Sequence, residues 1–157
     1  MMNSVIMPVH KIHPTAIVHP NAVIGKNVEI GAYAIVGDDV VIGDGCKLYP
    51  HAVIHEHTTV GKNCTFFPGC SIGAVPQDLK FAGEHSSTII GDGCIFRECT
   101  TVNRATGEGN KTIIGNNLLM MAYTHVAHNC IVGNNVIMSN VATLAGHVTV
   151  EDRAVIG

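Results

Sequence analysis

The sequence predicts an all-β chain in which very short strands alternate with tight corners. An apolar residue recurs at every sixth position from Ile12 to Ile72, and from Val18 onward a small residue such as Ala34 stands two positions before each of them. The residues between are rich in Asn, Asp and Gly, as in Lys26-Asn27 and Pro68-Gly69. A six-residue step fits neither an amphipathic helix nor a long alternating strand. Each hexad therefore predicts one short edge and one corner.

Residues 12–77 carry this pattern without interruption. Within a strand, residues two apart point to the same side, so the small residue and the apolar lead residue of each hexad are both expected to face inward. Asn, Asp and Gly tolerate the positive φ of a tight corner. The lead residues are Ile12, Val18, Ile24, Ile30, Val36, Ile42, Leu48, Ile54, Val60, Phe66 and Ile72.

Two stretches, 78–89 and 108–113, interrupt the repeat, and hexads continue over 114–157. Both interruptions keep the register modulo six, because lead residues resume at Ile90 and Ile114. They therefore predict loops that leave a corner and return to it, within one domain spanning 1–157. Insertions in a repeat protein commonly mark its binding face.

The hexads resemble those of the hexapeptide-repeat family, in which three hexads close one triangular coil and stacked coils form a left-handed parallel β-helix. The resemblance implies about seven coils here and places residues 18 apart in the sequence above one another at about 4.8 Å. It is this family likeness, and not the spacing, that implies the left hand.

Composition excludes several function classes. The chain of 157 residues has a net charge of -3 and no cluster of Lys and Arg, which argues against nucleic acid or an anionic membrane as a partner. No apolar run is long enough for a membrane span, and no secretory signal is evident, so we expect a cytoplasmic protein. Five of the six Cys fall at the small inward position, and free thiols are expected for all six.

The outward positions predict assembly. Ile17, Ile35 and Val53 would form one apolar stripe, and Val23 and Val41 a second, whereas the third face carries polar residues. Exposed apolar stripes on a soluble prism indicate association, and a closed cyclic oligomer would bury them. We therefore expect a homo-oligomer.

The segment 124–130 carries candidate chemistry. His125 falls at an outward position and His128 at the next corner, with Gly146 one coil above His128 by the 18-residue rule. A histidine base beside a glycine N–H suits acyl transfer, although the pair also fits an ordinary surface corner. Zinc is the other alternative, but it needs at least three protein ligands and a third would have to come from His147 or another chain. The sequence indicates no resident metal and no cofactor.

Four segments make the resemblance narrower. QDLKFAGE at 77–84, NLLM at 117–120, HVAHNC at 125–130 and ATLAGHV at 142–148 are similar to segments of the UDP-N-acetylglucosamine O-acyltransferases of lipid A synthesis. The likeness runs in order from about Ile12 to Gly157. It implies transfer of a 3-hydroxyacyl chain from acyl carrier protein to the glucosamine 3-hydroxyl of UDP-N-acetylglucosamine, in a homotrimer with a site between subunits.

The resemblance also implies residue roles. His128 matches the general base, and the Gly146 N–H matches the donor to the oxyanion. The matching substrate contacts are Gln77, Asp78, Lys80, His125 and, with a role less defined, His147.

Two departures from the family pattern stand out. Several members carry Asp where this chain has Asn129, and an Asn cannot stabilise an imidazolium as a carboxylate would, so any acid that orients His128 must lie elsewhere. Family members continue into a helical C-terminal region, whereas this sequence stops at Gly157, so that region is expected to be missing. A non-catalytic, oligomeric β-helix module therefore remains the alternative to the enzyme.

Overall fold

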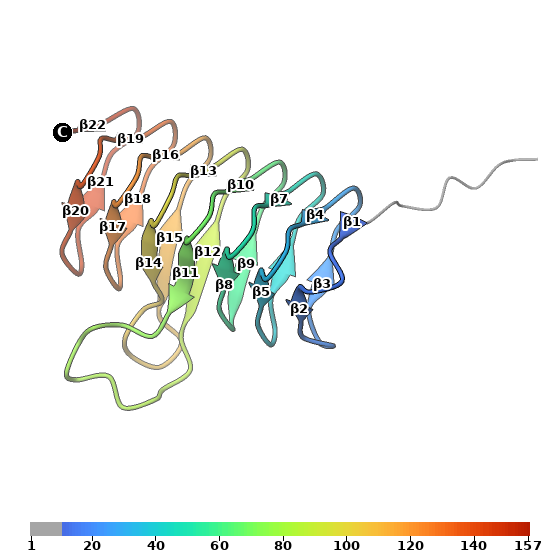
Figure 1. Ribbon diagram of the computed structural model, residues 1–157. Helices are drawn as coiled ribbons and strands as arrows, with labels where there is room; N and C mark the ends of the chain where they lie inside the picture. The colour runs from blue at the N-terminus through green and yellow to red at the C-terminus, as the bar shows by residue number, and fades with distance from the viewer. Residues whose placement is uncertain (1–10) are drawn as a thin grey trace, which may run out of the picture.

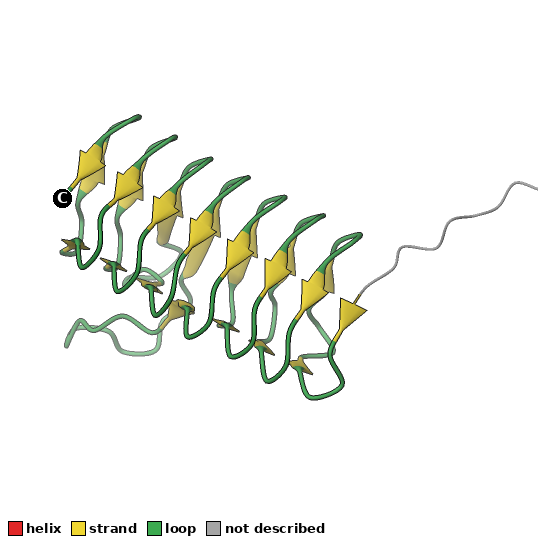
Figure 2. Cartoon of the chain, turned by 45° about the horizontal axis from the view of Figure 1, so that its top comes forward, coloured by secondary structure: helices red, strands yellow, loops and turns green. Residues whose placement is uncertain are grey.

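The computed structural model describes residues 11–157, so the first ten residues of the expected 1–157 domain lie outside the described part. Over residues 11–157 the chain forms 22 short strands and no helix (Figure 1). The chain visits three parallel sheets in turn, so each strand pairs with the strand three further along the chain. Figure 2 shows the stacked coils from a second direction.

The first sheet contains eight strands. They are β1 (Lys11–Ile12), β4 (Glu29–Ile30), β7 (Lys47–Leu48), β10 (Thr65–Phe66), β13 (Ile95–Phe96), β16 (Leu119–Met120), β19 (Ile137–Met138) and β22 (Val155–Ile156). We call this the polar sheet, because Glu29 bridges Lys11 and Lys47 on its outer surface with N···O distances of 3.6 Å each.

The other two sheets contain seven strands each. The second sheet comprises β2 (Ile17–Val18), β5 (Ile35–Val36), β8 (Val53–Ile54), β11 (Ser71–Ala74), β14 (Thr101–Asn103), β17 (His125–Val126) and β20 (Thr143–Leu144). The third comprises β3 (Val23–Ile24), β6 (Val41–Ile42), β9 (Thr58–Val60), β12 (Ser87–Ile90), β15 (Lys111–Ile114), β18 (Ile131–Val132) and β21 (Thr149–Val150).

The pairing register confirms the 18-residue coil and shows the effect of the insertions. Ile35 pairs with Val53 in the regular part. Thr65 pairs with Ile95 across the first insertion, and Ile95 pairs with Leu119 across the second. The insertions therefore lengthen one coil each by a whole number of hexads, which is why the strands return in register. The result is the left-handed parallel β-helix that the family likeness implies.

Both insertions are bounded differently from the sequence expectation. Strand β12 begins at Ser87 and β15 at Lys111, so the last residues of 78–89 and of 108–113 are strand and not loop. The reason is a ladder of buried threonines, because Thr88 pairs with Thr58 on one side and with Thr112 on the other. These threonines occupy the small inward position two residues before the lead residue, and the extended backbone starts one residue earlier still, at Ser87 and Lys111.

The core is a column of lead residues and small residues along the prism axis. Phe66 and Phe96 are fully buried and stack with ring centroids 5.0 Å apart. Ile12, on the first described strand, is 42% exposed because no described coil covers its outer side. All six Cys are free thiols, and all but Cys99 are buried, as the repeat predicts.

The outer surfaces also follow the repeat. Ile17, Ile35 and Val53 lie in adjacent strands of the second sheet, and Val23 pairs with Val41 in the third. Ile17 and Val23 are both more than 60% exposed. No helix among the described residues is long and apolar enough to cross a bilayer.

Candidate active site

The candidate residues gather along one edge of the prism, where the chain passes from the second sheet to the third. Both insertions leave from this edge, the first between β11 and β12 and the second between β14 and β15 (Figure 1). The corner between β17 and β18 carries His128, and the corner one coil above it carries Gly146 and His147. We call this line of corners the insertion edge.

His128 is oriented by its sequence neighbour. Its Nδ1 lies 2.9 Å from Oδ1 of Asn129. The Asn129 amide is itself held in one orientation, because Oδ1 accepts the Thr106 N–H at 2.9 Å and Nδ2 donates to the Thr106 carbonyl at 3.0 Å. An amide oxygen only accepts hydrogen bonds, so Nδ1 of His128 carries a proton, and in the neutral imidazole the lone pair is then on Nε2.

This arrangement answers the question, left open by the sequence, of which group orients His128. The orienting group is Asn129, a neutral acceptor, and it does so from the position where several family members carry Asp. The nearest carboxylate is that of Asp78, whose Oδ2 lies 3.9 Å from Nε2 on the opposite side of the ring. Asp78 therefore faces the reactive nitrogen and not the orienting one.

Gly146 packs directly against the His128 ring. A Cβ built on Gly146 would lie 2.6 Å from both Cε1 and Nε2 of His128, so this position admits only glycine without movement of the imidazole. The N–H of Gly146 donates no hydrogen bond to another described residue. His147 donates its N–H to the His128 carbonyl at 3.0 Å, and the two rings meet edge to face with centroids 5.1 Å apart.

The first insertion delivers Asp78 to this corner but leaves Lys80 apart from it. Asp78 is partly buried, and its Oδ1 accepts the N–H of Lys80 at 3.0 Å, which forms a local turn. The Lys80 side chain is exposed, and Lys80 is absent from the lining of the groove described next.

A groove of about 430 Å³ opens beside His128. It is lined by Gln77, Asn103, His125, Ala127, His128, Thr143, Leu144 and Ala145. The groove runs across the outer surface of β17 and β20, so the predicted residues Gln77, His125 and His128 share one concave surface.

His125 forms part of the groove floor. Its Nδ1 lies 2.7 Å from Oγ1 of Thr101 in the adjacent strand β14. Burial lowers the pKa of His125 below its ordinary value, so this imidazole is held in its neutral form. Nδ1 of His125 is engaged with Thr101, so Nε2 is the nitrogen that can form a hydrogen bond with a polar ligand.

Three polar residues of the site escaped the sequence analysis. Asn103 lines the groove and its Oδ1 is buried without a hydrogen-bond partner among the described residues. Arg104 is 8% exposed and donates to Glu56 Oε1 at 2.7 Å. Thr106 anchors Asn129. Their only sequence signal is that all three follow a lead residue, Val102, where a corner would ordinarily begin.

The sequence matches a known family model and several curated relatives. The family model for the bacterial transferase hexapeptide (six repeats) matches residues 21–56 and 39–74. A relative named acyl-[acyl-carrier-protein]--UDP-N-acetylglucosamine O-acyltransferase from Stenotrophomonas maltophilia is 50% identical over 92 residues, which is 58% of this chain and 35% of that protein. The chain thus spans about a third of the length of the curated relatives it matches.

Solved structures match more of the chain. A UDP-N-acetylglucosamine acyltransferase from Bacteroides fragilis aligns with a TM-score of 0.89 and 46% identity, covering 92% of this chain and 56% of that one. The UDP-N-acetylglucosamine acyltransferase of Francisella novicida aligns with a TM-score of 0.89 and 38% identity, covering 92% of this chain and 53% of that one.

Proposed function

We propose that this chain, which belongs to the hexapeptide-repeat family of left-handed β-helix proteins, carries the catalytic residues of a UDP-N-acetylglucosamine O-acyltransferase. The proposed reaction moves a 3-hydroxyacyl chain from acyl carrier protein to the glucosamine 3-hydroxyl, as in lipid A biosynthesis. The observation that carries the proposal is the pairing of a His128 Nε2 lone pair with an unengaged Gly146 N–H beside one groove.

His128 acts as the general base in this proposal. A sugar hydroxyl is a weak nucleophile, and Nε2 of His128 accepts its proton as the oxygen attacks the thioester carbonyl carbon. The Gly146 N–H donates a hydrogen bond to the oxyanion that forms on the carbonyl oxygen. When the tetrahedral intermediate collapses, the C–S bond breaks and the thiolate of the carrier takes the proton back from His128. No cofactor enters the sequence of steps.

The first insertion and the groove supply substrate contacts. The 3.9 Å separation between Asp78 and His128 Nε2 leaves the carboxylate available to the hydroxyl groups of a bound substrate. Gln77 and His125 line the groove and offer further hydrogen bonds to the sugar nucleotide. Lys80 is exposed, so it reaches the substrate only if the tip of the first insertion folds over the bound substrate. His147 contributes by packing its ring against that of His128.

The same proposal includes a homotrimer in the cytoplasm, with the groove at a boundary between subunits. The apolar stripes on the second and third sheets supply the surface for association. Free thiols at all six Cys are compatible with a reducing compartment.

An acyl-transfer assay tests the proposal. Wild-type protein is incubated with UDP-N-acetylglucosamine and 3-hydroxyacyl carrier proteins of several chain lengths, and the acylated sugar nucleotide is measured. His128→Ala is expected to lower kcat by about 10² to 10⁴, the usual range for a general base, with sugar-nucleotide binding retained. Gly146→Ala is expected to lower kcat at least as much, because its Cβ would displace the His128 ring.

The matched control is His51→Ala, which removes an exposed corner histidine outside the groove. It is expected to keep wild-type kcat. If His128→Ala kept more than about a tenth of wild-type kcat, the general base would be another residue, with His125 and His147 the next candidates.

A non-catalytic, oligomeric β-helix module is the second candidate, favoured by the position of Lys80, an expected substrate contact that is exposed and does not line the groove. Isothermal titration with UDP-N-acetylglucosamine separates the two. Binding that is lost in a Gln77→Ala variant supports the enzyme, whereas absence of both binding and turnover in a folded oligomer supports the module.

A further inference from the structure

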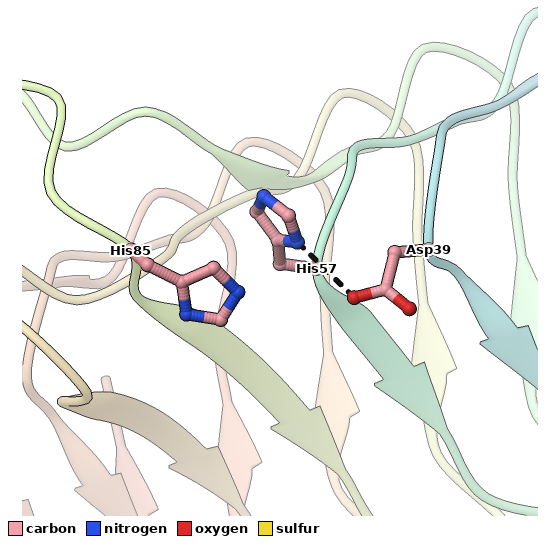
Figure 3. A group of neighbouring side chains, drawn as sticks. All are labelled: Asp39, His57 and His85. Atoms are coloured by element: carbon pink, nitrogen blue, oxygen red, sulfur yellow. Dashed lines mark hydrogen bonds and ion pairs between the residues drawn. The ribbon is translucent and has the colours of Figure 1, made fainter.

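A second cluster of side chains lies on the insertion edge, outside the groove. Asp39, His57 and His85 come from three successive coils, because Asp39 and His57 occupy equivalent corners 18 residues apart and His85 stands where the first insertion rejoins the next coil. Figure 3 shows the ring of His85 directed toward His57, with Asp39 on the other side of His57. One ligand atom from each residue lies within 4.8 Å of the other two.

The backbone at all three positions is fixed. Asp39 and His57 both have positive φ at their corners, and the His57 carbonyl accepts the Thr88 N–H at 3.2 Å. His85 donates its N–H to Glu108 Oε2 at 3.1 Å, and its carbonyl accepts the Gly109 N–H at 2.7 Å. Because these backbone positions are already ordered, binding of a ligand would restrict only the rotation of the three side chains. The loss of conformational entropy on binding is therefore small.

The side chains already face one another. Nδ1 of His57 lies 3.2 Å from Oδ2 of Asp39, and the rings of His57 and His85 have centroids 4.4 Å apart. Ligand atoms around a tetrahedral zinc ion lie about 3.3 Å apart, given metal–ligand bonds of about 2.0 to 2.2 Å. The three ligand atoms lie within 4.8 Å of one another, so binding requires them to move closer, and the exposed side chains of Asp39 and His85 are the ones free to rotate.

Neighbouring carboxylates are engaged elsewhere, which leaves Asp39 as the acid of the cluster. Glu56 is paired with Arg104. Glu84 accepts the N–H groups of Ala82 and Gly107 at 2.8 and 2.7 Å. Asp39 has His57 as its one side-chain partner among the described residues.

We propose that Asp39, His57 and His85 form a binding site for a divalent transition metal, with Zn²⁺ as the best match. Two imidazoles and one carboxylate are a ligand set that zinc accepts, and water completes a four-coordinate shell. The site is separate from the proposed acyltransferase centre and does not depend on it.

Metal binding at this site would tie the first insertion to the body of the prism. His85 is the second-last residue of the segment 75–86, whose earlier part carries Asp78 and Lys80. The other two ligands belong to regular corners of the preceding coils. A bound ion would therefore restrict the insertion from its C-terminal end, and the restriction can be measured without any assay of acyl transfer.

The direct test is a Zn²⁺ titration of metal-stripped protein in competition with a chromogenic chelator. We expect one Zn²⁺ per chain. Loss of residues that merely orient metal ligands costs about 10- to 100-fold in affinity, so loss of a ligand in His57→Ala or His85→Ala is expected to weaken binding at least about ten-fold. Asp39→Asn keeps the side-chain shape and is expected to weaken binding in the same direction.

His51→Ala is the matched control, because His51 is an exposed corner histidine with positive φ, like His57, but lies outside the cluster. It is expected to keep wild-type affinity. Thermal unfolding of each metal-free variant establishes that it is folded. Unchanged Zn²⁺ affinity in folded His57→Ala and His85→Ala, or loss of binding in His128→Ala instead, would overturn the proposal.

A second readout follows the insertion itself. Lys80 is exposed and offers a trypsin cleavage position within the segment 75–86. Zn²⁺ is expected to slow cleavage after Lys80 in wild type and in His51→Ala, but not in His57→Ala. Equal cleavage rates with and without Zn²⁺ in wild type would contradict the tethering of the insertion.

Discussion

Asn129 holds the His128 imidazole and the second insertion with the same side-chain amide. Its Oδ1 faces Nδ1 of His128 and the Thr106 N–H, and its Nδ2 donates to the Thr106 carbonyl. A carboxylate at this position would accept the first two hydrogen bonds but would repel the Thr106 carbonyl. The asparagine therefore matches the backbone of this insertion, and the neutral acceptor still fixes the tautomer of the base.

Asn129→Ala is expected to lower kcat by about 10-fold or more while changing KM little, because His128 remains but loses its fixed orientation. The same change should accelerate amide hydrogen exchange at Thr106, which loses its acceptor. Steady-state kinetics and exchange measured by mass spectrometry check the two effects. Normal kcat together with fast exchange at Thr106 would show that Asn129 serves the insertion alone.

His125, which lines the groove, also makes the free energy of unfolding depend on pH. Burial lowers the pKa of its folded-state imidazole, whereas the unfolded chain titrates near pH 6.5. As pH falls through about 6.5, the unfolded chain binds a proton that the folded chain does not, so the free energy of unfolding decreases until the lower folded-state pKa is reached.

His125→Gln is expected to flatten the decline of unfolding free energy below pH 6.5. One full proton gives a slope of about 1.4 kcal/mol per pH unit, and His125 contributes a fraction of it because its side chain is partly exposed. His55, whose pKa burial also lowers, leaves a residual slope. Urea unfolding between pH 5 and 8 measures the change, with His13→Gln as the exposed control. Identical slopes in wild type and His125→Gln would refute it.

The corners are the elements that the six-residue period specifies most directly. Asn27, Asn63, Asn117 and Asn135 all have φ between 56° and 57°, where Asn is better tolerated than other side chains. The corner between β19 and β20 departs from this rule, because Val141 has a φ of 69°. A β-branched residue in the left-handed region is strained, and Val141 is 66% exposed, so little burial compensates.

Val141→Asn is expected to raise the free energy of unfolding by about 1 kcal/mol, the lower end of the cost of a left-handed conformation. The reverse change, Asn117→Val, should lower it by at least as much, since it also removes the Asn117–Asn135 hydrogen bond of 3.2 Å. Chemical unfolding of both variants measures the pair. Destabilisation by Val141→Asn would show that Val141 contributes packing that outweighs its strain.

Sequence periodicity predicts the regular elements because each hexad contains both the inward-facing residues of its strand and the residues that form its corner. Lead residues such as Ile42 and Phe66 are buried as expected, and the 18-residue rule places Gly146 over His128 correctly. The rule cannot place residues within the insertions, because no hexad there defines their direction. The contacts between Asp78 and His128 and between Thr106 and Asn129 therefore emerge only from the structure.

The same limit explains why the Asp39, His57 and His85 cluster escapes the sequence. Asp39 and His57 are 18 apart and stack predictably, but His85 reaches them through an insertion whose boundary the sequence misplaced. Asp39 and His57 alone do not indicate a metal site in the sequence, because a zinc site needs at least a third protein ligand. The third ligand, His85, is placed by the first insertion, which ends where Ser87 begins strand β12.

At the scale of the whole molecule, the three faces of the prism differ in the side chains that they expose, and therefore in how well each could pack against another copy. The polar sheet carries the Lys11–Glu29–Lys47 ladder on its first three strands, which water solvates well, and exposes Ile95, Ile137 and Val155 further along. The second and third sheets expose aliphatic side chains in register along several coils, including Ile17 and Ile35 on one and Val23 and Val41 on the other. Burial of such stripes releases about 25 cal/mol per Å² of apolar surface, so these two faces favour contact with another copy.

We therefore expect a homotrimer of about three times the 16.6 kDa chain mass, because each subunit can place one apolar face against a different apolar face of the next and so close a ring. Multi-angle light scattering at micromolar concentration measures this mass. Ile35→Glu combined with Val41→Glu introduces a charge on each apolar stripe and is expected to yield monomer, whereas Lys47→Gln changes the polar sheet and should leave the trimer intact. A stable wild-type monomer would remove the intersubunit groove from the proposed mechanism, and a trimer lost only in Lys47→Gln would place the interface on the polar sheet instead.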